Sequence, residues 1–280
     1  LIVTVFAISF GLLIDQSHKA WAQDQPLKMW VFDIGQGDAI FLELPTGEQI
    51  LIDSGRDKTI LQKLGSVMWP WDRHIDMIIA THSDADHISG FVSVLERYRV
   101  DAIIETGARA QTSVDKAFVK AITEEQAVHH FVKHGDHWQF GETKIEVLWP
   151  DETFKGVIKD LNETSIVIRV TYGETIILLT GDAEKNAEIE LGNRAGDIDV
   201  LKVGHHGSTT SSSRIFLQEV DPEVSIISVG LDNSYGHPHP VILERLKQIG
   251  STIFRTDLDG DILLKSWGGE PIISPAPLPF

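Results

Sequence analysis

The sequence contains no cysteine in its 280 residues. Disulfide bonds, thiolate metal ligands and cysteine nucleophiles are therefore excluded. Any metal ion that the protein binds must be held by histidine and carboxylate side chains, and the sequence supplies 12 His and 41 Asp and Glu residues.

Basic residues are scarce relative to acidic ones. The 24 Lys and Arg residues and 41 Asp and Glu residues give a formal net charge of −17 at pH 7. The molecule as a whole therefore has no general electrostatic attraction for nucleic acid or anionic lipid. Binding to DNA would need a local basic groove, for which Lys202, Arg214 and Arg245 are candidates.

Long hydrophobic runs are also missing. The opening run, LIVTVFAISFGLLI, has 14 residues, whereas a membrane-spanning helix needs about 20. Ala20-Trp21-Ala22 follows as a small-x-small pattern typical of a signal-peptidase site. We predict a secretory signal at residues 1–22; the alternative is a short uncleaved anchor, because the usual basic region is missing. Both alternatives place residues 23–280 outside the cytoplasm, as a secreted or periplasmic domain.

Hydrophobic residues make up 42% of the chain, enough for a sizeable core. Short apolar runs predict strands near 27–34, 39–44, 49–53, 76–81, 145–149, 164–171, 175–180, 198–203, 224–229 and 261–266. Helical periodicity predicts helices over 57–67, 87–98, 112–126, 184–193, 211–219 and 240–249. This order predicts an α/β (α+β) fold with two sheets face to face and helices outside. No low-complexity linker divides the chain, so we expect a single domain.

The segment THSDADHISG places four potential metal ligands, His82, Asp84, Asp86 and His87, directly after a predicted strand. In an extended loop, side chains two residues apart point the same way, so His82 and Asp84 can reach one ion. The turn into a helix beginning near His87 redirects the last two side chains toward a second point. Four ligands in six residues therefore indicate two metal ions close together.

Further polar side chains follow other predicted strands. Asp182 and Glu184 follow one strand, His205 and His206 the next, and Asn233, His237 and His239 a third. Loops at strand ends on a rigid scaffold are where catalytic groups gather. These residues therefore complete a candidate site together with the first cluster.

Five segments occur in order along the chain: FDIGQGDAIFLELPTGEQILIDSG, THSDADHISG, TGDAE, LKVGHHGS and NSYGHPHP. This set resembles the metallo-β-lactamase-fold hydrolases, most closely the extracytoplasmic domain of ComEC-type DNA-uptake competence proteins. A bacterial phosphorylcholine esterase is similar in the same motifs. The resemblance spans about residues 27–267. It implies a four-layer αββα sandwich with a two-metal site at the sheet edges and hydrolysis of phosphodiesters.

The resemblance also implies roles for individual residues. His82 and Asp84 match ligands of one metal, Asp86 and His87 match ligands of the other, Asp182 matches the bridging carboxylate, and His206 matches a late ligand of the second metal. His205 and Glu184 match groups that contact phosphate or the leaving group, and His237 is a further candidate for substrate contact. Asp86 is also expected to orient the attacking hydroxide.

Two departures from the superfamily pattern bear on the metal. Asp84 stands where the wider superfamily has a second histidine, which agrees with the competence branch and argues against a β-lactamase. Asn162, in LNETSIVI, stands where a third histidine is usual. A site richer in oxygen favours harder ions, so we expect two divalent ions, either Mn²⁺ or Zn²⁺.

The implied function is a phosphodiesterase or nuclease that acts outside the cytoplasm through a hydroxide activated by two metals. DNA is the expected substrate, with a separate DNA-uptake channel as a partner and membrane contact only through an uncleaved N-terminal segment. The alternatives are a small-molecule phosphodiesterase like the phosphorylcholine esterase and a non-catalytic metal-binding accessory protein of DNA uptake.

Other segments predict structural roles. Asp53 and Asp38 are expected to support the site or a turn rather than to bind metal. The tryptophans of VMWPWDR are expected to pack a loop onto the core, and DLDGDI, residues 257–262, is expected to form a tight hairpin turn.

Overall fold

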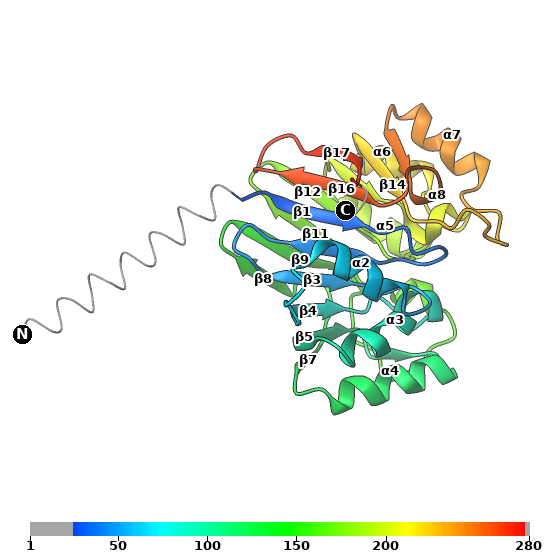
Figure 1. Ribbon diagram of the computed structural model, residues 1–280. Helices are drawn as coiled ribbons and strands as arrows, with labels where there is room; N and C mark the ends of the chain where they lie inside the picture. Colours follow the sequence, from blue (N-terminus) through cyan, green and yellow to red (C-terminus); the bar gives the residue numbers. More distant parts are fainter. Residues whose placement is uncertain (1–24, 278–280) are drawn as a thin grey trace, which may run out of the picture.

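The computed structural model describes residues 25–277, and the predicted signal with its cleavage site after Ala22 lies outside them (Figure 1). An eight-stranded first sheet has the order β17-β16-β1-β2-β3-β4-β5-β7. Its strands are β1 (Leu27–Val31), β2 (Ile40–Glu43), β3 (Gln49–Ile52), β4 (His74–Ile79), β5 (Arg99–Glu105), β7 (Val128–Phe131), β16 (Ile262–Ser266) and β17 (Ile272–Pro275).

A seven-stranded second sheet has the order β15-β14-β13-β12-β11-β9-β8. Its strands are β8 (His137–Phe140), β9 (Thr143–Trp149), β11 (Val167–Tyr172), β12 (Thr175–Leu179), β13 (Val200–Lys202), β14 (Val224–Ile227) and β15 (Thr252–Arg255). Two short strands, β6 (Ala108–Arg109) and β10 (Gly156–Val157), pair outside both sheets.

The two sheets pack face to face because side chains alternate along each strand. In β3, Ile50 and Ile52 join the core between the sheets, whereas Leu51 points outward under the helices. Helices α2 (Thr59–Val67), α3 (Ala85–Leu95) and α4 (Ser113–Glu124) bury apolar residues against the outer face of the first sheet. Helices α5 (Lys185–Ala195), α6 (Arg214–Val220) and α7 (Pro240–Gln248) do the same on the second sheet. The predicted αββα sandwich is confirmed.

Strand direction gives the sandwich two different ends. Strands β3, β4 and β5 are parallel in the first sheet, and β12, β13, β14 and β15 are parallel in the second. Their carboxyl ends lead into the loops that hold the sequence-predicted site residues. Hairpin turns and the start of β1 form the opposite end (Figure 1).

The sequence did not predict β5, β7, β8, β15 or β17. Four of these, β7, β8, β15 and β17, are the edge strands of the two sheets. An edge strand has one neighbour and needs no continuous apolar run; β7, for example, reads VHHF and is exposed throughout. The missing amphipathic signal is the physical reason for the omission of the four edge strands; it does not explain β5, which lies between β4 and β7.

The hairpin turn predicted for DLDGDI is wrong. Residues Thr256–Asp259 form a short helix, α8. The strands on either side, β15 and β16, belong to different sheets. The segment is therefore a crossover between sheets, which a local turn pattern cannot distinguish from a hairpin.

Gly90 shows how tightly α3 packs beside the site. A Cβ atom at this position would lie 2.1 Å from the backbone oxygen of Ser54. Gly90→Ala should therefore destabilise the protein by about 1–3 kcal/mol despite alanine's higher helix propensity. Gly65 in α2 has open space where a Cβ atom would lie, so Gly65→Ala should stabilise by about 0.5–1 kcal/mol. Urea unfolding of both variants checks this; equal effects would contradict the close packing of α3.

Candidate metal centre

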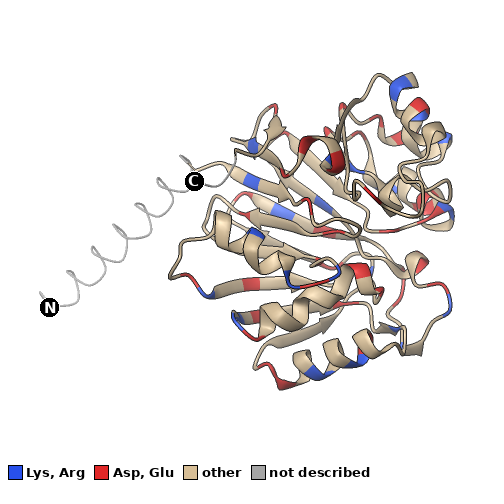
Figure 2. Cartoon of the chain, turned by 45° about the vertical axis from the view of Figure 1, so that its right-hand side comes forward, with Lys and Arg blue, Asp and Glu red and all other residues tan. Residues whose placement is uncertain are grey.

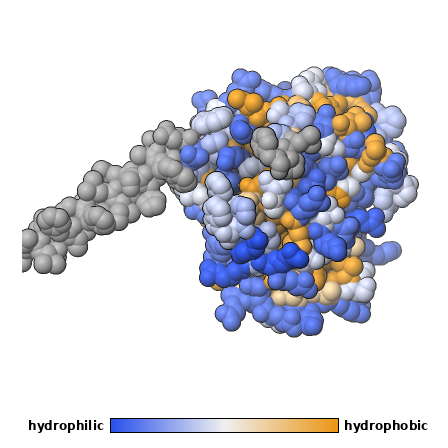
Figure 3. Space-filling view, in the orientation of Figure 1, coloured by the Kyte–Doolittle hydropathy of each residue, from blue (hydrophilic) through white to orange (hydrophobic). Residues whose placement is uncertain are grey.

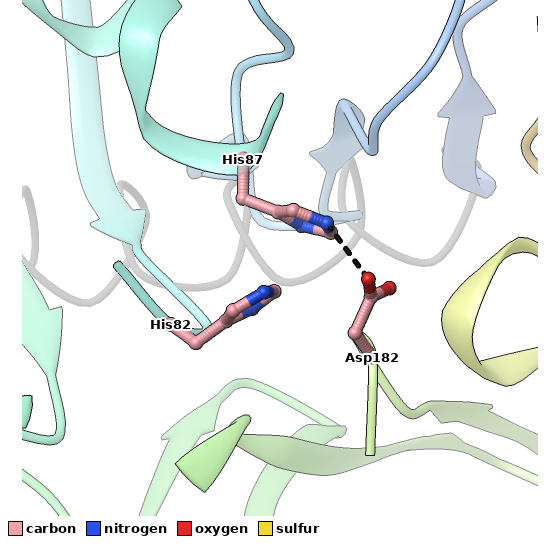
Figure 4. A group of neighbouring side chains, drawn as sticks. All are labelled: His82, His87 and Asp182. Atoms are coloured by element: carbon pink, nitrogen blue, oxygen red, sulfur yellow. Dashed lines mark ion pairs between the residues drawn. The ribbon is translucent and has the colours of Figure 1, made fainter. Parts of the chain in front are cut away.

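The sequence-predicted metal ligands converge at the carboxyl ends of β4, β12 and β13. His82 lies in the loop after β4, and Asp86 and His87 lie in the first turn of α3, which begins at Ala85, slightly earlier than predicted. Asp182 follows β12 and His206 follows β13. Figure 4 shows the rings of His82 and His87 directed toward Asp182.

Short distances join these side chains. The Oδ2 atom of Asp182 is 3.3 Å from Nε2 of His87 and 3.4 Å from Nε2 of His206. His82, His87 and Asp182 offer ligand atoms within 4.8 Å of one another, and so do Asp86, His87 and His206. These two groups share His87, so the cluster offers two adjacent positions for a metal ion.

Asp84 directly precedes α3 at the edge of the cluster, and its side chain makes no capping hydrogen bond to the helix. Its Oδ2 atom is 3.6 Å from Nε2 of His82, and its side chain is 42% exposed. The hydrogen bond with His82 lowers the pKa of Asp84 against the effect of burial. The carboxylate is therefore charged at neutral pH and faces both His82 and solvent.

Each of the three buried imidazoles uses its Nδ1 atom to contact an oxygen. Nδ1 of His87 is 2.7 Å from Asp53 Oδ2, and Nδ1 of His206 is 2.9 Å from the backbone oxygen of Ser228. Nδ1 of His82 is 3.1 Å from the hydroxyl of Thr81, which itself donates to Asp53. With Nδ1 held by an oxygen, each ring directs its Nε2 atom into the cluster, which is the orientation that a metal-binding imidazole needs.

The inward-facing atoms have no other partner. Among residues 25–277, the Nε2 atoms of His82, His87 and His206 and the Oδ1 atom of Asp182 are buried without a hydrogen bond. Buried polar atoms are almost always paired, so four convergent exceptions need a ligand. Imidazole nitrogen and carboxylate oxygen suit a divalent metal ion, and these residues fit one.

The electrostatics of the cluster also favours a cation. Burial alone would lower the pKa of His87, but the carboxylates of Asp182 and Asp53 outweigh it and hold that pKa well above its usual value. Burial alone would raise the pKa of Asp182, but His206 and His87 outweigh it and hold that pKa well below its usual value. Positive charge between these side chains is therefore stabilised.

Backbone strain is concentrated at the same place. His205 has φ 47° and His206 has φ 53°, both in the left-handed region that non-glycine residues avoid. Asp53, which contacts His87, has φ 55°. Each such residue costs about 1–3 kcal/mol, which the surrounding structure must offset. The left-handed backbone conformation places the side chains of both His205 and His206 in the site.

His205 and Glu184 lie together beside the buried cluster. Nδ1 of His205 is 3.1 Å from Oε1 of Glu184, and Nε2 of His205 is 3.9 Å from Oδ2 of Asp182. Asn162, at the position of the missing third histidine, donates to Glu184 over 3.2 Å. Asn162 therefore supports this pair.

His237 completes the rim of the site. Its ring meets that of His205 edge-on at 5.7 Å and stacks with Tyr235 at 5.7 Å and 21°. Burial, together with the nearby imidazoles of His205 and His206, lowers the pKa of His237 to about 4. The ring is thus neutral at pH 7. His239 lies next to it, with ring centroids 5.2 Å apart.

Asp38 and Lys202 form a buried ion pair that the sequence analysis missed. Nζ of Lys202 is 2.7 Å from Oδ2 of Asp38, and both side chains are at most 1% exposed. Oδ1 of Asp38 lies 3.5 Å from Nδ1 of His206. A lysine inside the apolar parallel strand DVLKV was the available signal, because buried charges require a partner.

Of the three candidates for a basic groove, Lys202 is removed by its burial, whereas Arg214 and Arg245 line one small pocket. Lys202 is buried and held by Asp38, and Arg245 donates to the backbone oxygen of Ser212. Figure 2 shows Lys and Arg scattered among Asp and Glu on the visible face. Direct contact between Lys202 and a DNA phosphate is therefore ruled out, because its ammonium group is buried and paired with Asp38.

A sequence model described as the metallo-beta-lactamase superfamily matches residues 32–230. The chain belongs to this superfamily. Membership agrees with the fold and with the histidine and aspartate cluster as a site for divalent metal, and members of this superfamily are mostly metal-dependent hydrolases.

The chain is similar to several competence proteins, which confirms the ComEC-type resemblance. It is 34% identical to ComE operon protein 3 of Bacillus subtilis over 83% of this chain and 32% of that protein. It is 29% identical to Recombination protein 2 of Haemophilus influenzae (93% and 32%) and 31% identical to Competence protein ComA of Neisseria gonorrhoeae (82% and 31%). The chain spans about a third of the length of these relatives.

Solved structures show the same fold. The metallo-beta-lactamase fold protein YhfI from Bacillus subtilis matches with a TM-score of 0.59 at 12% identity, covering 87% of this chain and all of that one. CmlA, a diiron β-hydroxylase from Streptomyces venezuelae, matches with a TM-score of 0.56 at 13% identity, covering 86% of this chain and 54% of that one.

Lys202→Met tests the buried ion pair. The change leaves the carboxylate of Asp38 buried without its partner, so it should destabilise the protein by about 3–5 kcal/mol in urea unfolding. The double variant Asp38→Asn with Lys202→Met removes both charges and should recover part of the loss. A Lys202→Met protein as stable as the parent would contradict the pairing.

Proposed function

We propose that the protein is an extracytoplasmic phosphodiesterase that hydrolyses DNA with two divalent metal ions. The observation that carries the proposal is the convergence of three buried, unpaired Nε2 atoms on Asp182, beside the His205–Glu184 pair. The competence proteins among the relatives support DNA as the substrate class and a DNA-uptake channel as the partner.

The side chains divide between two metal positions. His82 and Asp84 would hold one ion, Asp86, His87 and His206 the other, and Asp182 would bridge them. Three imidazoles and three carboxylates form this set, a mixture that accepts Mn²⁺ or Zn²⁺. When bound, such ions activate water and neutralise charge on phosphate oxygens.

His205 is suited to proton transfer. Glu184 fixes its ring through Nδ1, so that Nε2 points toward the cluster 3.9 Å from Asp182. From this position Nε2 can donate a proton to the departing oxygen of a phosphodiester. His237 stays neutral at pH 7, so its role is to orient the substrate by hydrogen bonding, rather than to supply a proton.

The rim also favours a nucleotide over a small aliphatic ester. Tyr235 is 56% exposed and stacks with His237, which presents a flat aromatic surface next to His205. Nucleobases stack on such surfaces irrespective of their sequence. Stacking supplies binding energy in addition to any contact of phosphate with Arg214 and Arg245, which line one pocket.

The function is tested by digestion of linear single- and double-stranded DNA and of a chromogenic phosphodiester, with Mn²⁺ and Zn²⁺ supplied separately. We expect cleavage of DNA that depends on metal and falls as salt rises, while turnover of the small diester changes little with salt. Cleavage of the small diester with intact DNA would instead support a small-molecule phosphodiesterase. No cleavage of either, with metal bound, would support an accessory role.

Asp182→Ala should abolish both activity and metal binding. Asp182 is the carboxylate shared by His87 and His206, so its loss should lower the affinity for metal by at least the roughly 10–100-fold expected for supporting groups. Metal content measured after dialysis, together with DNA cleavage, checks this. Asp197→Ala, at an exposed position, is the matched control. An active Asp182→Ala protein with full metal content would exclude the proposed site.

A further inference from the structure

Two exposed tryptophans stack on each other far from the metal centre. Trp69 is 68% exposed and Trp71 is 76% exposed, with ring centroids 5.2 Å apart and an angle of 15°. The expectation that they pack a loop onto the core is therefore wrong. Large exposed apolar groups gathered in one place mark an interaction surface.

These tryptophans lie at the end of the sandwich opposite the metal centre. They follow α2 and precede the amino end of β4, whereas the metal ligands follow its carboxyl end. Trp267, 53% exposed, lies at the same end, because it follows Ser266, which pairs with Leu27 at the start of β1. Ile272, 63% exposed, continues this surface from the start of β17. We call Trp69, Trp71, Trp267 and Ile272 the tryptophan end.

A groove of about 270 Å³ lies alongside this surface. Val67, just before the stacked pair, and Lys265, just before Trp267, both line it. Lys28 also lines the groove; it contacts Glu43 over 2.6 Å and lies 5.9 Å from the ring of Trp30. Lys265 forms no ion pair within residues 25–277. The groove thus combines apolar walls with two lysine side chains and with Asp261, whose carboxylate is paired with Lys63 over 2.7 Å. Figure 3 shows exposed apolar residues among hydrophilic ones on the face that carries α2.

We propose that the tryptophan end rests on the interface of a lipid bilayer. Tryptophan is enriched at the headgroup level of membranes because its ring is largely apolar and its N–H is polar. Lysine stems can lie along apolar surface while their ammonium groups reach lipid phosphate. The surface therefore has the side-chain chemistry of a bilayer contact.

The connection of the chain supports lipid rather than another occupant. The apolar run at residues 1–14 precedes Leu27 by 12 residues, and Leu27 lies at the tryptophan end. Twelve extended residues reach about 40 Å at most. When the N-terminal segment is retained as the uncleaved anchor, a bilayer that holds the run is within reach of Trp69, Trp71 and Trp267, and the metal centre then faces away from it. Within residues 25–277 no helix is long and apolar enough to span a membrane.

The proposal is tested with the full chain on phosphatidylcholine vesicles whose acyl chains carry bromine, which quenches nearby tryptophan emission. Trp21→Phe is introduced throughout, so that the N-terminal segment contributes no signal. We expect quenching in this parent and its loss in the triple variant Trp69→Phe, Trp71→Phe, Trp267→Phe. Trp149→Phe, at the metal-centre end of β9, is the matched control and should retain the quenching.

Two results would overturn the proposal. One is equal quenching in the triple variant and in Trp149→Phe, or no quenching while the chain sediments with vesicles. The other is a change in Trp69 and Trp71 emission on adding a single-stranded oligonucleotide without any effect of lipid, which would assign the surface to base stacking. The readout needs no substrate and no metal, so it is independent of the phosphodiesterase proposal.

Discussion

Asp38 and Lys202 hold the loops of the two sheets together beneath the metal centre. Asp38 follows β1 and Lys202 ends β13, so their ion pair of 2.7 Å joins the first sheet to the second. The same loop approaches α3 so closely that a Cβ on Gly37 would lie 2.0 Å from the backbone oxygen of Asp86. Because Asp38 also lies near His206, one buried interaction positions ligands that come from both sheets.

The rest of the site stores free energy that a bound cation can release. Three imidazole nitrogens and an oxygen of Asp182 are buried without partners, and His205 and His206 have strained backbones. Unpaired buried polar groups cost about 1–3 kcal/mol each. The apolar core between the two sheets must offset these unfavourable free energies. The metal centre therefore depends on the stability of the αββα scaffold.

Parallel strands explain why the two functional surfaces lie apart. All ligand-bearing loops follow strands that point the same way, so they gather at one end of the sandwich. The hairpin turns and the start of β1 are left at the other end, together with Trp69, Trp71 and Trp267. A single topology thus separates the metal centre from the proposed membrane contact.

The sequence alone determined the two-sheet architecture and the clustering of His82, Asp182 and His206, because apolar runs and polar strand ends are local patterns. The tertiary structure decided what depends on distant partners. Only it showed that Lys202 is buried against Asp38, and that Trp69 and Trp71 are exposed. Burial is a property of the packed chain, since a lysine or a tryptophan has the same letter inside or outside, and the residues that cover it come from elsewhere in the sequence.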